Sequence, residues 1–148
     1  MTGLVNISST NGKLWDFVRE SNRIERIERE PTPAEIDAHV RLLNESILTV
    51  EHVNQFVREV QPGARLRDLN GSNVRVGSHR PIPGGPEVRL QLFNLLYRMN
   101  NSEWTTTTAY ELHCEYETLH PYTDGNGRSG RALWLWIMLG ADDDSNAL

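Results

Sequence analysis

The chain has 148 residues, 38% of them hydrophobic, which is enough apolar material for one domain with a single core. Its formal net charge of -5 argues against a general nucleic-acid binder, which would need a basic face. The longest apolar run, "ALWLWIMLG" at residues 132–140, is too short to cross a bilayer. We therefore expect one domain over residues 1–148, with no nucleic-acid or membrane partner.

The ends and the single cysteine add a prediction of location. Cys114 allows no internal disulfide, which is typical of a reducing compartment. The first residues lack the basic and apolar regions of a secretory signal, so the sequence predicts a cytoplasmic protein. Residues 1–30 form an N-terminal segment, and three consecutive aspartates predict a solvated acidic tail over residues 141–148.

Two helices are predicted in the first half of the chain. Residues 31–43 begin with a capping pattern, in which Thr32 can cap, Pro33 suits the first turn and Glu35 can bond back to the cap. A second helix follows Thr49 and ends at "QPG". Its apolar stripe consists of Val50, Val53, Phe56, Val57 and Val60.

The segment "GSNVRVGSHRPIPGGPEV", residues 71–88, has a different pattern. It alternates weakly around Val74 and Val76 and is then interrupted by prolines and glycines, which predicts an extended segment or an irregular hairpin. Further helices are predicted over residues 87–100, over residues 105–120, and from the loop after residue 120 to about residue 139. The predicted fold class is all-α: a helical bundle with a short β-hairpin flap.

The stretch "HPYTDGNGRSGR", residues 120–131, contains the spacing G-x-G-x-x-G of the dinucleotide-binding fingerprint. That fingerprint needs a buried strand before its first glycine and a βαβ unit around it. Here the preceding segment is polar and contains Pro121, so no such unit is expected. The chain also lacks the G-x-x-x-x-G-K-[ST] pattern of a P-loop.

The glycines instead predict an anion site. Gly125 and Gly127 bracket Asn126 directly before a helix, and such a turn can point several backbone N–H groups at one place. Arg128 and Arg131 follow three residues apart, so both can reach one polyphosphate.

Two further side chains indicate group transfer. Asp124 would repel a bare phosphate but suits a divalent cation that bridges phosphate oxygens. His120 can take a proton from an incoming hydroxyl. Taken alone, a histidine before proline is most often a cap, and an aspartate before glycine a turn former. Their occurrence together with the anion site favours a phosphate-transfer site, whereas His113 is expected to be structural.

These residues resemble the Fic family. "HPYTDGNGRSGR" closely matches the signature H-[PA]-F-x-[DE]-G-N-G-R-x-x-R, with Tyr122 in place of phenylalanine. "SHRPIPGGPEV", residues 78–88, resembles the target-docking flap of the family, and the likeness extends from about Ser21 to Leu139.

The resemblance implies a protein adenylyltransferase, with ATP and a target protein as partners and Mg²⁺ as cofactor. His120 would be the general base that activates a Ser, Thr or Tyr hydroxyl, and Asp124 would hold Mg²⁺. The implied nucleotide-binding residues are Gly125, Asn126, Gly127, Arg128 and Arg131. In the flap, Val74, Val76 and Ile82 would pair with the target by strand addition. Whether a homo-oligomer or a regulatory partner is involved stays open.

The resemblance also implies an inhibitory element. "SNRIER" supplies Ser21 and Glu25 of the family's [ST]-x-x-x-E-[GN] pattern, with Arg26 at the last place, and the glutamate would pair with Arg131. In the alternative interpretation, residues 25–30 form i,i+4 ion pairs on a solvated helix face, each contributing about 0.2–0.5 kcal/mol.

Two other functions stay open from the sequence. One is a catalytically silent module of the same family that binds a nucleotide or a partner. The other is a family enzyme that uses another nucleotide donor or removes AMP. Retention of His120 and Asp124 favours an enzyme, because a pure binder needs neither a base nor a metal ligand.

Overall fold

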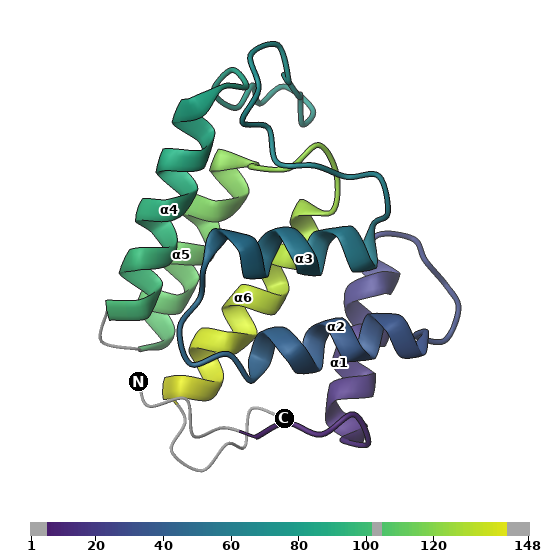
Figure 1. The fold of residues 1–148 in the computed structure, drawn as a ribbon. Helices are drawn as coiled ribbons and strands as arrows, with labels where there is room; N and C mark the ends of the chain where they lie inside the picture. The colour runs from purple at the N-terminus through teal and green to yellow at the C-terminus, as the bar shows by residue number, and fades with distance from the viewer. Residues whose placement is uncertain (1–5, 102–104, 142–148) are drawn as a thin grey trace.

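The computed structural model describes residues 6–101 and 105–141, and this part of the chain folds into six helices (Figure 1). In chain order they are α1 (Gly12–Ile24), α2 (Pro33–Leu43), α3 (Val50–Val60), α4 (Pro86–Asn101), α5 (Thr106–Leu119) and α6 (Asn126–Ala141). The all-α prediction is confirmed. None of the described helices is both long enough and apolar enough to traverse a membrane. Residues 142–148 of the predicted acidic tail lie outside the described residues.

Local sequence sets the starts of α2 and α3. Thr32 accepts from the backbone N–H of Glu35, and Glu35 accepts from the backbone N–H of Thr32, as the capping pattern predicts. Thr49 caps α3 in the same manner, with His52 in the place of the usual glutamate. Both helices therefore begin where the sequence indicates.

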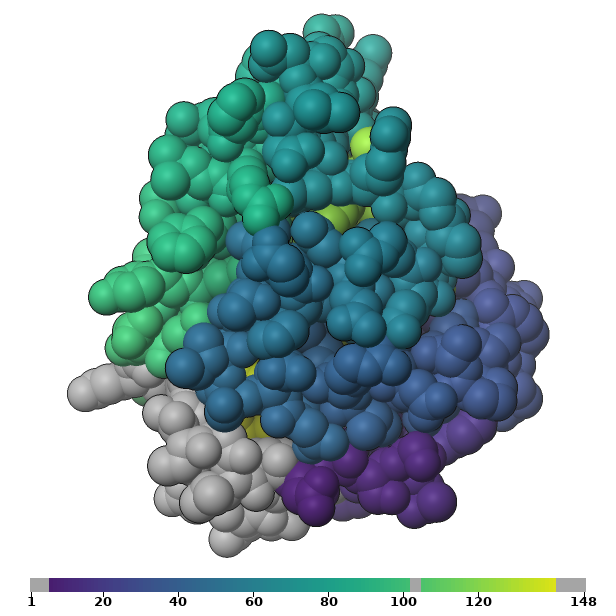
Figure 2. All heavy atoms as spheres, viewed as in Figure 1, coloured from purple at the N-terminus to yellow at the C-terminus, as the bar shows by residue number. Residues whose placement is uncertain are grey.

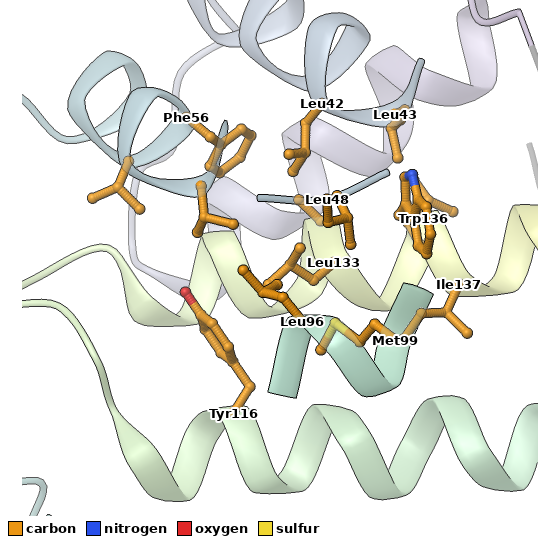
Figure 3. Close-up of a cluster of buried hydrophobic side chains, with 14 of the residues drawn as sticks. Leu42, Leu43, Leu48, Phe56, Leu96, Met99, Tyr116, Leu133, Trp136 and Ile137 are labelled. Carbon is orange, nitrogen blue, oxygen red and sulfur yellow. The ribbon is translucent and has the colours of Figure 1, made fainter. Parts of the chain in front are cut away.

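Helix α6 is the central element of the fold. It packs against α1, α2, α3 and α5, and a helix enclosed in this way must be apolar around most of its circumference. Figure 3 shows its side chains meeting those of α2, α3, α4 and α5 in the core; the α6 residues labelled there are Leu133, Trp136 and Ile137. On the face shown in Figure 2, α6 is visible only through small openings between the surrounding elements. The turn that begins α6 is therefore held by the most buried helix of the protein.

The predicted β-hairpin is not confirmed. Residues 71–85, which we call the flap loop, contain one isolated antiparallel bridge between Val76 and His79, closed by a tight turn at Gly77. Pro81 and Pro83 follow at once, and because proline has no N–H to donate, the ladder ends there. The flap loop is thus an irregular loop with a single bridged turn.

Candidate active site

The signature residues form a short loop between α5 and α6. His120 follows the last residue of α5 and adopts a left-handed backbone conformation, with φ 50° and ψ 63°. Its backbone N–H donates to the carbonyl of Tyr116 over 3.0 Å. For a residue other than glycine this conformation costs about 1–2 kcal/mol. Such strain is concentrated at functional sites, where surrounding contacts maintain it.

Tyr122 and Asn126 hold this loop in shape. The Tyr122 ring is buried, and its hydroxyl donates to Asn54, which explains how tyrosine replaces phenylalanine here. The Asn126 side chain accepts from the backbone N–H of Tyr122 over 2.9 Å and donates to its carbonyl over 2.8 Å. Both polar atoms of the Asn126 side chain are thus used to close the loop, and its implied role in nucleotide binding stays a prediction.

The anion site predicted at the start of α6 faces a carboxylate. Gly125 has φ 81°, a conformation that glycine adopts without strain, and it places the first turn of α6 directly after the loop. A Cβ on Gly127 would lie 2.3 Å from Oε2 of Glu25, so that carboxylate rests against the first turn of α6. Helix N-termini favour negative charge at this position. The Glu25 carboxylate therefore lies where the helix N-terminus favours negative charge.

Arg131 is bound by both residues of the predicted inhibitory pair. Its Nε donates to the hydroxyl of Ser21 and one Nη donates to the Ser21 carbonyl, each over 2.9 Å. The same Nη forms an ion pair of 2.8 Å with Glu25. The end of α1 thus meets the second arginine of the signature, across 110 residues of sequence.

The alternative interpretation of residues 25–30 is wrong. Helix α1 ends at Ile24, so these residues do not form a solvated helix face. Arg29 pairs with Glu35, and Glu30 pairs with Arg19. Neither expected i,i+4 pair, Glu25–Arg29 or Arg26–Glu30, is formed.

The backbone at Arg26 explains the glycine or asparagine expected there. Arg26 has φ 63°, and the N–H of Ile27 donates to the carbonyl of Asn22 over 3.0 Å, which is a Schellman ending of α1. Glycine and asparagine adopt this conformation readily, whereas arginine does so at a cost of about 1–2 kcal/mol. The departure at Arg26 is therefore absorbed as local backbone strain, and Glu25 keeps its position at the end of the helix.

Arg128 lies in a buried network, not at the face of the loop. Its guanidinium donates to Gln61 and Asn22 and lies 3.6 Å from the carboxylate of Glu35. Burial lowers the pKa of Arg128, and the charge of Glu35 opposes this. Burial would raise the pKa of Glu35, but hydrogen bonds from Arg29 and other donors outweigh it and hold that pKa at about 2. The side chain of Arg128 is thus bound by Gln61 and Asn22, and its predicted contact with a polyphosphate stays a prediction.

His120 and Asp124 lie at the two ends of the loop. The pKa of the half-buried His120 is lowered, first by burial and then by the positive charge of Arg67. Asp124 is exposed, and one of its carboxylate oxygens accepts from the backbone N–H of Gly125 over 2.8 Å. His120 is therefore neutral near pH 7 and able to accept a proton.

The flap residues occupy different environments. Val76 is exposed and Val74 is half-buried, whereas Ile82 packs against the core. The backbone groups of Val76 are already bonded to His79, and the carbonyl of Ile82 accepts from Arg67. An incoming strand would have to displace or avoid these bonds.

Glu117 was missed by the sequence analysis. Its carboxylate lies against Gly130 of α6, where a Cβ would come within 2.2 Å of Oε1, and this buried oxygen has no hydrogen-bond partner among the described residues. Burial raises its pKa to about 7; Arg131 acts against this rise and Glu25 adds to it. In the sequence Glu117 resembles an ordinary helix-surface glutamate, since nothing in the pattern indicates that a glycine faces it.

We expect Glu117→Gln to stabilise the protein at high pH only. Because the folded-state pKa of about 7 exceeds the ordinary value of 4.5, the carboxyl costs nothing below about pH 4.5. Its destabilising effect grows from there to about pH 7 and is complete above it. The full shift, reduced for remaining exposure, corresponds to about 2 kcal/mol. Urea unfolding should show this gain for Glu117→Gln at pH 8 and almost none at pH 4. Glu111→Gln, which removes an exposed carboxylate of the same helix, is the control. An equal gain at both pH values would contradict the assignment.

Comparison with known proteins identifies relatives. Residues 35–138 match the model of the Fic/DOC family. The chain is 31% identical over 117 residues to "Protein adenylyltransferase fic-1" of Caenorhabditis elegans and 30% identical over 117 residues to the protein of the same name in Caenorhabditis briggsae. Each match covers 70% of this chain but 23% of the relative, so the chain spans about a quarter of the length of these relatives. No solved structure matches the chain.

Proposed function

The chain belongs to the Fic/DOC family, and from this premise we propose that it is a protein adenylyltransferase, which transfers AMP from ATP to a Ser, Thr or Tyr hydroxyl of a target protein. The observation that carries the proposal is the loop between α5 and α6. It joins a neutral histidine to a helix N-terminus that favours anions, with Arg131 beside it.

The chemistry follows from these groups. His120 takes the proton of the target hydroxyl while the oxygen of that hydroxyl bonds to the α-phosphorus. The bond from the α-phosphorus to pyrophosphate breaks at the same time. The backbone N–H group of Gly127 stabilises the charge that develops on the α-phosphate, and that of Gly125 joins it once the Asp124 oxygen releases it. Arg131 binds the outer phosphates once Glu25 has released it. Catalysis is thus mainly positioning and electrostatic stabilisation.

The donor set at the loop fits magnesium. Mg²⁺ usually binds proteins through one or two carboxylates together with substrate phosphates, and Asp124 presents one exposed carboxylate beside the anion site. When bound, Mg²⁺ would neutralise charge on the phosphates. Asp124 would hold it.

We further propose that Glu25 inhibits the enzyme. Its carboxylate pairs with Arg131 and lies against the first turn of α6. A triphosphate would therefore lack the positive charge of Arg131 and would be repelled by the negative charge of Glu25. Ser21 strengthens this state through its two bonds to Arg131.

The experiment that tests the function is intact mass measurement after incubation with ATP and magnesium. A mass gain of one AMP on the chain or on an added target protein, with pyrophosphate released, supports adenylyl transfer. If the Glu25→Gly chain, in which the proposed inhibition is removed, binds ATP but gains no AMP, the catalytically silent module is supported instead. Repeating the assay with GTP, CTP and UTP, and with a target that already carries AMP, tests the other donors and the reverse reaction.

A further inference from the structure

Arg67 connects the flap loop to the end of α5. Its side chain is completely buried, and all the hydrogen-bond partners that the described residues give its guanidinium are backbone carbonyls. Nε donates to His120 over 2.7 Å and Nη2 donates to Leu119 over 3.0 Å. Nη1 donates to Ser72 over 3.0 Å and to Ile82 over 2.9 Å. One planar group therefore binds two carbonyls on each side.

The end of α5 needs such a partner. The last carbonyls of a helix have no partner within it, and α5 has no basic residue in its last turn. Arg67 supplies both the donors and the positive charge at Leu119 and His120, and His79 of the flap loop contacts the carbonyl of Thr118 over 3.0 Å. Three successive carbonyls that end at His120 are thus bonded to groups outside the signature.

Backbone contacts place Arg67 itself. Its N–H donates to the carbonyl of Pro121, and its carbonyl accepts from the N–H of Gly85, each over 2.9 Å. Leu66 forms an isolated bridge with Tyr122. Arg67 therefore lies between the signature loop on one side and the last residues of the flap loop on the other.

We propose that Arg67 is a positioning residue for His120, and that it fixes the flap loop and the backbone of the base as one unit. The left-handed conformation of His120 is strained, and the bond to its carbonyl is one of the contacts that maintain it. Because the same guanidinium binds Ser72 and Ile82, a target that moves the flap loop also moves His120. This reading of the contact rests on the proposed function, but the contact itself can be tested without activity.

The first test is hydrogen exchange of backbone amides in Arg67→Met and Arg67→Lys. Lysine keeps the charge but cannot form the planar fork of bonds, so it should not substitute for arginine. We expect amides of the flap loop and of His120, Tyr122 and Thr123 to lose protection together, by at least about tenfold, while α2 and α3 keep theirs. Arg65→Met, which removes a neighbouring exposed arginine, should change neither segment. Loss in only one segment, in neither, or equally throughout the protein would overturn the proposal.

The second test uses the transfer reaction. Arg67 contacts none of the residues proposed to bind the nucleotide, so Arg67→Lys should lower kcat by at least about tenfold and leave KM for ATP within about twofold. A parallel rise in KM, or an unchanged kcat, would contradict the positioning role. If the Glu25→Gly chain, freed of the proposed inhibition, transferred no AMP, the proposed function would fail, whereas the exchange experiment would still decide whether Arg67 joins the two segments.

Discussion

Glu25→Gly is expected to raise the rate of AMP transfer, including self-modification, by about 10–100-fold. The carboxylate forms a charge-assisted bond with Arg131 and lies against the first turn of α6. Such a bond contributes about 1.5–3 kcal/mol, which corresponds to this range of rates if it must break before ATP binds productively. The measurement is transfer of label from α-labelled ATP, together with KM for ATP, which should fall.

Two further variants separate charge from helix ending. Glu25→Gln removes the charge but keeps the size and the end of α1, so it should also activate, although less than glycine. Glu28→Gly introduces the same flexibility at an exposed glutamate close by and should leave the rate unchanged. If both Glu25 variants transferred AMP at the wild-type rate or more slowly, Glu25 would be only a surface charge.

His120→Ala is expected to abolish AMP transfer, with a loss of about 10²–10⁴-fold. General base catalysis typically contributes this much, and His120 is the residue at the loop whose lowered pKa keeps it neutral. Binding of ATP should be retained, because the backbone N–H groups and Arg131 are untouched. The measurement is label transfer and nucleotide affinity in the Glu25→Gly background, because the rate with His120 intact is expected to be highest there.

His113→Ala is the control for this variant. His113 lies seven residues earlier on α5 and contacts the carbonyl of Gly130 over 3.2 Å, so its loss should reduce stability modestly and preserve transfer. If His120→Ala kept more than about a tenth of the rate, another group would have to be the base.

The pH dependence gives an independent check on His120. The neutral imidazole is the active form, and its pKa in the folded protein lies below the ordinary 6.5. As the pH falls, the rate should therefore reach half of its plateau value only below pH 6.5. A half-maximal rate at or above pH 6.5 would contradict the lowered pKa.

The sequence predicted the helices and the composition of the loop well because these depend on local chemistry. The capping box of Thr32 and Glu35 marks the start of α2, and the cap at Thr49 marks the start of α3. Each signal is formed by residues only a few positions apart in the sequence. The site at residues 120–131 could be predicted from the order and spacing of the residue types within that stretch alone. Even the pairing of Glu25 with Arg131 could be expected, but only through the family resemblance.

The flap loop shows where local patterns mislead. Alternation around Val74 and Val76 predicted a hairpin, yet only one bridged pair forms, since strand pairing depends on partners as well as on propensity. Arg67 looks like one more arginine of a polar loop, and nothing nearby in the sequence indicates that it is buried against Leu119 and His120.

The sequence by itself determined the helical class, the capped starts of α2 and α3, and the loop chemistry of residues 120–131. Only the tertiary structure decided that Arg128 lies in a buried network, that Asn126 closes the loop, and that Arg67 binds the backbone of His120. The physical reason is the distance along the sequence over which the deciding interactions act. Caps and turns are set by neighbours within about four residues, whereas the direction of a long charged side chain is set by the donors, acceptors and burial that distant segments bring to it.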